Sequence, residues 1–219
     1  MRKIAPFLLL LLVVSASAQT TIPLNASRWV IDPKRPQENK PFQEGEAIAF
    51  NFPESPYADP FSSGPWLGYL VTPWNAPLRG QTLTATFTLE TDGPKNGKRV
   101  RFNYVGEAAN TCESPANVRF YFQTGDLYNN NDGSRWWSNP GRWVLVKGSN
   151  LATLTVDLSP QNFTSTYGHS GGTMPSAFWN AVNHPSYVGL TFGGGCFFGH
   201  GINVFKGSAK FTLVDYSTH

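Results

Sequence analysis

Apolar and polar residues alternate one by one in several stretches of the chain. The clearest stretch covers residues 82–89, in which every second residue from Leu83 to Leu89 is apolar and the other four are all threonine. This two-residue period is typical of a strand with one buried face. Further stretches with this period, rich in threonine and aromatic residues, lie at residues 100–105, 118–122, 151–158 and 209–214. Each of them is a predicted strand.

Shorter apolar stretches add about five weaker strand predictions, at residues 28–31, 47–50, 68–71, 142–146 and 187–192. A helix is predicted in one place, at residues 177–182, between Pro175 and Pro185. Parallel strands need long crossover connections, usually helical, and the sequence predicts only this short one. The predicted fold class is therefore all-β: an antiparallel, jelly-roll-like β-sandwich with one short helix.

The N-terminus has the three parts of a secretory signal peptide. Arg2 and Lys3 precede the apolar residues 7–14, and Ala16 and Ala18 suit a cleavage site. The apolar run is too short to span a bilayer. We expect residues 1–18 to be removed, the mature protein to be secreted or periplasmic (extracytoplasmic), and no membrane span to remain. A retained anchor is the alternative.

The rest of the chain reads as one domain. Residues 19–64 hold many prolines and are predicted to wrap the sandwich as a leader that supplies edge strands, while residues 65–219 form the sandwich itself. With 40% hydrophobic and 14% charged residues, the 219-residue chain can bury a core. Two cysteines, Cys112 and Cys196, in an exported chain predict one disulfide bond, with free thiols as the alternative.

The charge of the chain argues against a nucleic-acid partner. Without Arg2 and Lys3, the 17 Lys and Arg residues become 15 against 14 Asp and Glu, so the formal net charge falls from +3 to +1. The remaining cations are scattered, except for a group at residues 95–101 that reads as a solvated hairpin tip. Phosphate binding needs several clustered cations.

A resemblance to known domains rests on three features. They are the succession of strands from Trp66 to Tyr216, the long polar loop before Trp143 and the glycine-rich closing hairpin. Together they resemble the jelly-roll sandwiches of galactose-binding-like domains and carbohydrate-binding modules. Residues 188–204 also resemble the C-terminal part of uncharacterised exported bacterial proteins. The resemblance implies a carbohydrate or cell-surface glycan as the partner.

The loop at residues 125–142 concentrates side chains that suit a sugar. A sugar ring packs its C–H face on an aromatic ring and pairs its hydroxyls with amides, carboxylates and guanidinium groups. His200, flanked by two glycines, is a further candidate contact. The predicted ligand-binding residues are Tyr128, Asn130, Asp132, Arg135, Trp136, Trp137 and His200.

The three tryptophans near this loop are expected to differ. Adjacent residues of an extended segment face opposite ways, so the core should bury at most one of Trp136 and Trp137, and the other should be available to stack on a sugar or a partner protein. Trp143 begins an apolar run and should point into the core. In the alternative interpretation, the loop tryptophans cap the core and the asparagines are turn residues.

Catalytic signals are weak, and no catalytic residue is predicted. Residues 168–172 match the Gly-x-Ser-x-Gly nucleophile elbow at Ser170, with Asp215 and His219 downstream, but a polar segment precedes the match where a buried strand is required. Glycosidases need two carboxyl groups near each other, and the nearby pairs, Glu107 with Glu113 and Glu44 with Glu46, lie in turns.

No metal site or cofactor is predicted. Residues 129–133 resemble part of a calcium loop, yet Tyr128 and Asn139 stand where an EF-hand needs acidic ligands. A structural calcium ion held by backbone carbonyls is left open. The leading hypothesis is an exported, non-catalytic sandwich that binds carbohydrate. The alternatives are an exported structural or surface-adhesion protein without a small ligand, and a carbohydrate-active hydrolase or lyase.

Overall fold

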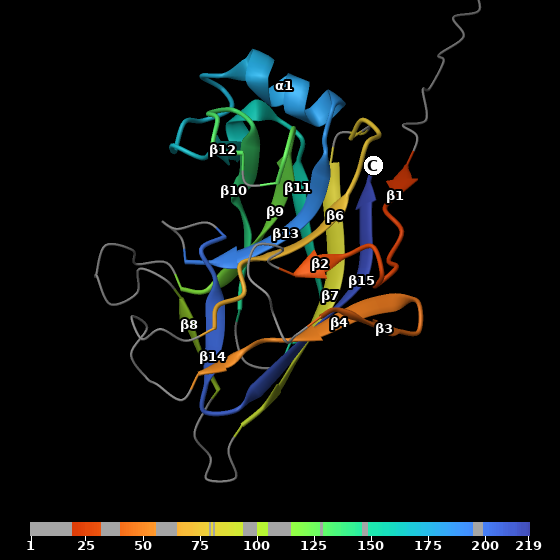
Figure 1. The fold of residues 1–219 in the computed structure, drawn as a ribbon, viewed down its shortest axis with the longest axis vertical. Coiled ribbons are helices and arrows are strands. Elements are labelled where there is room, and N and C mark those ends of the chain that lie inside the picture. The colour runs from red at the N-terminus through yellow and green to blue at the C-terminus, as the bar shows by residue number, and fades with distance from the viewer. Residues whose placement is uncertain are drawn as a thin grey trace, which may run out of the picture.

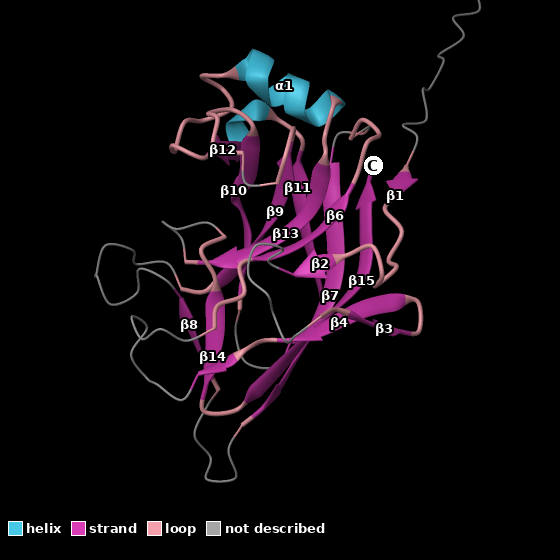
Figure 2. Ribbon diagram, in the orientation of Figure 1, coloured by secondary structure: helices cyan, strands magenta, loops and turns pink. Residues whose placement is uncertain are grey.

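The computed structural model describes residues 19–31, 40–55, 65–78, 80, 82–93, 100–104, 115–127, 129–145, 149–194 and 199–219. The predicted signal peptide, both cysteines, Tyr128, Glu107 and Glu113 lie outside these residues. The described part is built of strands, one α-helix and one 3₁₀ turn (Figures 1 and 2). None of its helices has the length and apolar character needed to cross a membrane.

One large sheet, which we call the β15 sheet, contains six strands paired in antiparallel fashion. Its order is β11-β7-β15-β4-β3, and β1 also pairs with β15. The strands are β1 (Thr20–Thr21), β3 (Phe42–Glu44), β4 (Ala47–Asn51), β7 (Thr82–Asp92), β11 (Ser149–Asp157) and β15 (Ser208–Thr218).

The second large sheet, the β9 sheet, also has six antiparallel strands, in the order β12-β10-β9-β13-β6-β2. They are β2 (Val30–Ile31), β6 (Tyr69–Pro73), β9 (Asn117–Gln123), β10 (Arg135–Val144), β12 (Phe163–Ser165) and β13 (Tyr187–Gly193). A smaller sheet joins β5 (Glu54–Ser55), β14 (Ile202–Phe205) and β8 (Arg101–Tyr104), and its β5–β14 pair is parallel.

The core lies between the two large sheets. On β7, the apolar residues from Leu83 to Leu89 are all buried, as their alternation predicts. Phe50 of β4 meets Phe192 of β13 edge to face at 5.6 Å between ring centroids, and Phe120 of β9 meets Tyr216 of β15 in the same way at 5.7 Å. These contacts join the two sheets into a sandwich, so the predicted all-β, antiparallel class is confirmed.

Helix α1 (Pro175–Asn183) closes one end of the sandwich (Figure 2). Proline at its start suits a helix because the first backbone N–H groups have no partner within a helix. Phe178, Ala181 and Val182 are buried, while Trp179 points to solvent. The helix predicted at residues 177–182 is confirmed, and a 3₁₀ turn, η1 (Pro160–Asn162), lies before β12.

Candidate functional site

The outward face of the β9 sheet carries a second buried cluster, separate from the core. It consists of Tyr69, Val71, Tyr121 and Trp137. Trp137 lies opposite Tyr121 in the register of β10 and β9, and their ring centroids are 5.3 Å apart. Tyr69 approaches Tyr121 edge to face at the same distance. Three aromatic rings from three strands thus lie side by side on one face.

Trp136 faces the other way, into the core. Its ring meets Phe178 of α1 at 5.4 Å, and its indole N–H donates to the Gly133 carbonyl at 2.8 Å. Trp136 is 0% exposed and Trp137 is 4% exposed. The opposite orientation of the two rings agrees with the sequence prediction, and the core buries only Trp136. Trp137 is buried as well, but in the separate outward cluster, because both faces of β10 are covered here.

Trp136 is therefore a core residue, since a ring inside the sandwich offers no face to a ligand. Trp143 packs against the core and meets Phe87 edge to face at 5.9 Å, as its place in an apolar run predicts. It is only half-buried, however. The predicted loop at residues 125–142 is wrong in its second half, because β10 begins at Arg135 and contains both Trp136 and Trp137. Of these two tryptophans, Trp137 alone remains as a candidate for the ligand site.

The guanidinium group of Arg135 lies among the rings of this cluster. Its Cζ is 4.9 Å from the centroid of Trp137, 5.8 Å from that of Tyr69 and 6.0 Å from that of Tyr121. Nε donates to the Tyr121 hydroxyl at 3.2 Å, Nη2 to the Tyr69 hydroxyl, and Nη1 to Asn130 Oδ1 at 3.0 Å. Burial lowers the pKa of Arg135, but the two phenol oxygens outweigh it, so the pKa is raised and the group stays charged.

A pocket of about 130 Å³ lies beside this arginine. It is lined by Tyr69, Arg135, Trp137, Ser165, Thr166, Gly168 and His200. Gly168 and His200 are exposed, so they mark the side that meets solvent. The Oγ1 atom of Thr166 is buried and has no hydrogen-bond partner within the part of the chain that the structure describes. Buried hydroxyl groups rarely lack a hydrogen-bond partner, so this one needs an explanation.

Gly199 explains how His200 reaches the pocket. Its φ is +66°, in the left-handed region that glycine occupies without strain. A Cβ atom there would stand 2.8 Å from the Tyr69 hydroxyl and 3.2 Å from the Trp137 indole nitrogen. The backbone therefore passes close to the polar edges of these two rings, and the next residue, His200, lines the pocket.

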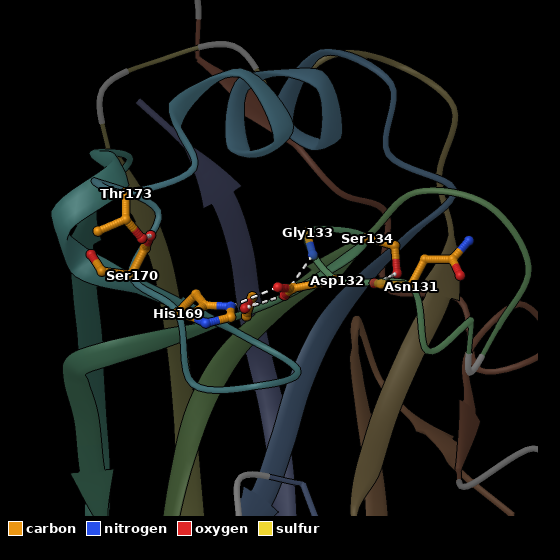
Figure 3. A network of polar contacts seen from close by, with 8 residues as sticks. Asn131, Asp132, Gly133, Ser134, His169, Ser170 and Thr173 are labelled. Carbon is orange, nitrogen blue, oxygen red and sulfur yellow. Dashed lines mark hydrogen bonds and ion pairs between the residues drawn. The ribbon is translucent and has the colours of Figure 1, made fainter.

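Asp132 holds the opposite wall of the pocket in place. Its Oδ1 accepts from the Ser165 hydroxyl at 2.7 Å and from the Gly133 backbone N–H at 3.0 Å, and its Oδ2 lies 2.6 Å from His169 Nδ1 (Figure 3). Partial burial raises the pKa of Asp132, but the hydrogen bonds with Ser165 and His169 outweigh it, so the pKa is lowered. Asp132 thus ties the turn at residues 165–169 to the loop before β10.

The asparagines of this loop serve mainly as turn residues, as the alternative interpretation holds. Asn129 Oδ1 accepts from the Asn131 backbone N–H at 3.0 Å, and the carbonyls of both residues accept from the Ser134 hydroxyl. Asn130 differs because its amide oxygen accepts from Arg135. Asn130 and Asp132, predicted as ligand contacts, therefore hold pocket residues in position.

Only some of the predicted site residues line the pocket. Arg135, Trp137 and His200 line one pocket although His200 is far away in sequence. The pocket residues that the sequence analysis missed are Tyr69, Ser165, Thr166 and Gly168. Tyr69 belongs to a predicted strand without nearby polar signals. Gly168 is the first residue of the Gly-x-Ser-x-Gly match, and Ser165 and Thr166 come shortly before it. The glycines and small polar residues of this segment were the only available signal.

The serine of that match forms an isolated β-bridge with Thr164 just before a turn. Ser170 Oγ accepts from the Gly172 backbone N–H at 3.1 Å, and its side chain points away from His169 (Figure 3). A catalytic triad needs the histidine between the serine and the acid. Here the acid, Asp132, lies between Ser165 and His169 instead. Among the described residues, no three His, Cys, Asp or Glu side chains gather in a way that would hold a metal ion.

Comparisons with known proteins add little to what the geometry of the pocket shows. No protein-family model matches the chain, and no curated protein matches it in sequence. Among solved structures, the chain is similar to a xylan-binding module, CBM15, with 12% sequence identity and a TM-score of 0.42 over 91% of this chain and 98% of that one. A likeness at that level says nothing about the ligand of this protein.

Proposed function

We propose that the protein is an exported, non-catalytic β-sandwich that binds carbohydrate in the pocket between β10 and the turn at residues 165–168. The observation that carries the proposal is the composition of this pocket. Aromatic rings, Tyr69 and Trp137, stand beside a held guanidinium, two hydroxyl side chains and an imidazole. Sugars are recognised by this combination, since their rings are apolar on one face and their hydroxyls need donors and acceptors.

The size of the pocket suits one ring-sized unit. Its volume of about 130 Å³ is close to that of a cavity of ~150 Å³ that accommodates a benzene ring. Tyr167 lies between two lining residues, Thr166 and Gly168, and 65% of it is exposed. An exposed phenol ring beside the pocket offers a face on which an adjoining sugar unit can pack. This arrangement favours an oligosaccharide over a single sugar.

The pocket favours binding over cleavage. Glycosidic hydrolysis uses two carboxyl groups about 5 to 10 Å apart across the bond. Neither aspartate nor glutamate is among the described lining residues, and Asp132 is turned toward Ser165, Gly133 and His169. The partnerless hydroxyl of Thr166 favours a ligand-binding protein over one that is purely structural.

The test compares two pocket variants with matched controls. His200→Ala and Thr166→Val remove polar groups from the pocket, and His184→Ala and Thr155→Val make the same changes at exposed positions on α1's end and on β11. Loss of one hydrogen bond, about 1 kcal/mol, should weaken retention on the polysaccharide that the protein binds by about fivefold. The controls should bind like the unaltered protein.

The proposal fails if the pocket variants and the controls bind equally well. It also fails if the unaltered protein is retained on none of a broad panel of neutral and acidic polysaccharides. Thermal midpoints of all four variants, measured in parallel, show whether a loss of binding comes from unfolding.

Export is part of the same proposal and is supported by the signal-like residues 1–18. Protein recovered from outside the cytoplasm should begin at Gln19 and should show no titratable thiol after unfolding, because Cys112 and Cys196 are expected to be joined. A sequence that begins at Met1 would contradict export, and two reactive thiols per chain would contradict the disulfide.

A further inference from the structure

The floor of the pocket is a part of the outward face of the β9 sheet. It consists of Tyr69 from β6 and of Arg135 and Trp137 from β10. The Arg135 guanidinium lies 4.9 Å from the centroid of the Trp137 ring and donates a hydrogen bond to the Tyr69 hydroxyl. The strands supply only this floor, so the loops around it decide which sides of the pocket are closed.

The first wall is the backbone around His200, just before β14. Gly199 brings this backbone close to the Tyr69 hydroxyl, because a Cβ atom at Gly199 would stand 2.8 Å from it. The Gly201 backbone N–H donates to the Phe192 carbonyl of β13 at 3.0 Å, so the segment is held against the sheet. His200, between the two glycines, lines the pocket. This wall therefore has a fixed position.

The second wall is the turn at the end of β12, which contributes three of the lining residues. The Ser165 backbone N–H donates to the His169 carbonyl at 2.8 Å, and the Gly168 N–H donates to the Ser165 carbonyl at 3.0 Å. Thr164 and Ser170, one residue further out on each side, form a β-bridge. These contacts close the turn on itself, so this wall is fixed as well.

The third side of the pocket is bounded by the loop before β10. Asn130 Oδ1 accepts from Arg135 Nη1 at 3.0 Å, and two residues later Asp132 Oδ1 accepts from the Ser165 hydroxyl at 2.7 Å. Asp132 Oδ2 also lies 2.6 Å from His169 Nδ1 (Figure 3). This short segment therefore spans from the sheet to the turn and closes the end of the pocket between them.

The side of the pocket next to Tyr167 faces solvent. Tyr167 is 65% exposed, and Gly168 is exposed too. A unit inside a glycan chain is linked to a neighbour on both sides, so it needs a groove with two openings. A terminal unit is linked on one side only, so a single opening is sufficient. Walls that are fixed before binding also limit the loss of conformational entropy on binding.

We propose that the pocket binds the terminal unit of a glycan chain and that the next unit leaves it over the ring of Tyr167. This inference rests on the proposed function and narrows its ligand class from carbohydrate in general to chain ends. The pocket volume of about 130 Å³ agrees with it, because this is space for one ring. Each chain should therefore bind one protein molecule, whatever its length.

The experiment is a calorimetric titration of the mature, full-length protein with soluble xylan, β-glucan, galactan and polygalacturonate. Each polysaccharide is used intact and after partial endo-hydrolysis to shorter chains. Recognition of ends predicts one bound protein per chain at every length. Recognition of internal units predicts a number of bound proteins that rises with chain length. Borohydride opens the ring at the reducing end, so loss of binding after this treatment assigns the reducing end, and retention assigns the other end.

Tyr167→Ala tests the path of the glycan chain out of the pocket. It should weaken binding of a short oligosaccharide by roughly three- to tenfold, with an unchanged thermal midpoint because the ring is exposed. Trp179→Ala removes another exposed aromatic ring, on α1, and is the matched control. The control should bind like the unaltered protein.

Asp132→Ala tests the closed end of the pocket. It removes the contacts with Ser165 and His169, so long chains should pass through and bind more than one protein each. Asp132→Asn keeps an acceptor for the Ser165 hydroxyl and should stay closer to one protein per chain. Asp157→Ala removes an exposed aspartate from β11 and is the control. Where Asp132→Ala does not fold, the titration of the unaltered protein decides the result.

The results separate this inference from the proposed function. A number of bound proteins that rises with chain length in the unaltered protein overturns recognition of ends and leaves carbohydrate binding in place. No binding to any of the polysaccharides or their fragments overturns both. Equal binding losses in Tyr167→Ala and Trp179→Ala, or one protein per chain in a folded Asp132→Ala variant, overturn the proposed path and the proposed closed end.

Discussion

Strands β7 and β9 each alternate between core-facing and outward-facing residues, yet their outward residues differ in exposure to solvent. On β7, threonines such as Thr84 and Thr86 point outward and remain half-exposed. On β9, Arg119, Tyr121 and Gln123 point outward and are buried. The outward face of the β9 sheet is covered by loops, as the passage of Gly199 over Tyr69 shows. Because loops cover this face, its polar side chains are buried and held in fixed positions.

The first prediction concerns Trp136, on the core side of this comparison. Trp136→Ala should lower the free energy of unfolding by about 3 to 5 kcal/mol, because the ring is fully buried against Phe178. Trp143→Ala should cost clearly less, since that ring is half-buried. Chemical denaturation of both variants checks this. An equal cost would mean that the two rings are equally buried.

Tyr69→Phe tests the covered outward face. The change removes an oxygen that accepts from the Arg135 guanidinium and keeps the ring. A hydrogen bond to a charged group contributes about 1.5 to 3 kcal/mol, so both stability and glycan binding should fall. Tyr187→Phe, at the edge of the same cluster, is the matched control and should change little. Unchanged stability in Tyr69→Phe would show that its hydroxyl does not hold Arg135.

Gly199→Ala tests the loop that covers the face. A side chain at φ +66° costs about 1 to 2 kcal/mol, and its Cβ would also crowd the Tyr69 hydroxyl. We expect weaker binding together with a lower thermal midpoint. Gly45→Ala has a similar φ of +62° but meets no atom within 4 Å, so it should lower stability and leave binding intact. Loss of binding in both variants would contradict a local role for Gly199.

A smaller effect is expected for the pH dependence of stability that comes from Asp132 in the pocket wall. The pKa of Asp132 is lowered in the folded protein, so its stabilising effect is complete above the carboxyl pKa of the unfolded chain and is lost as pH falls through the folded value. Because the pair with His169 is partly exposed, we expect less than about 1 kcal/mol. Asp132→Asn should remove this part of the acid destabilisation. Identical acid profiles for both proteins would show that the contact contributes nothing.

The smallest effect is expected on the exposed face of the β15 sheet. Thr155→Val replaces a hydroxyl that lies 3.4 Å from that of Thr84 on the neighbouring strand. Exposed substitutions of this kind stay within about 0.5 kcal/mol, and valine suits a strand. Thermal unfolding should therefore be nearly unchanged. A large loss would mean that the outward faces of the two sheets are more alike than the burial of their residues indicates.

Local pattern predicted most of the longer strands and the helix, but it placed residues 135–141 of β10 in a polar loop and did not predict β3, β12 or β14. The alternation in residues 82–89 predicted β7 and its buried side, and Pro175 and Pro185 bounded the helix correctly. The same reasoning oriented Trp136 and Trp137 oppositely. It did not reveal that Trp137 is covered on the outward face, because alternation tells which side a residue faces and carries no information about what lies on that side.

The amino-acid sequence by itself determined the longer strands such as β7 and β9, their inner and outer faces, helix α1 and the all-β class, because each follows from residues within a few positions of one another. Only the tertiary structure decided that Tyr69, Arg135, Thr166 and His200 share one pocket. These residues come from distant parts of the chain, and they meet because β6 and β10 belong to one sheet and two separate loops pack on its outward face. Strand order and loop packing depend on the summed burial of the whole sandwich, which no local window of sequence contains.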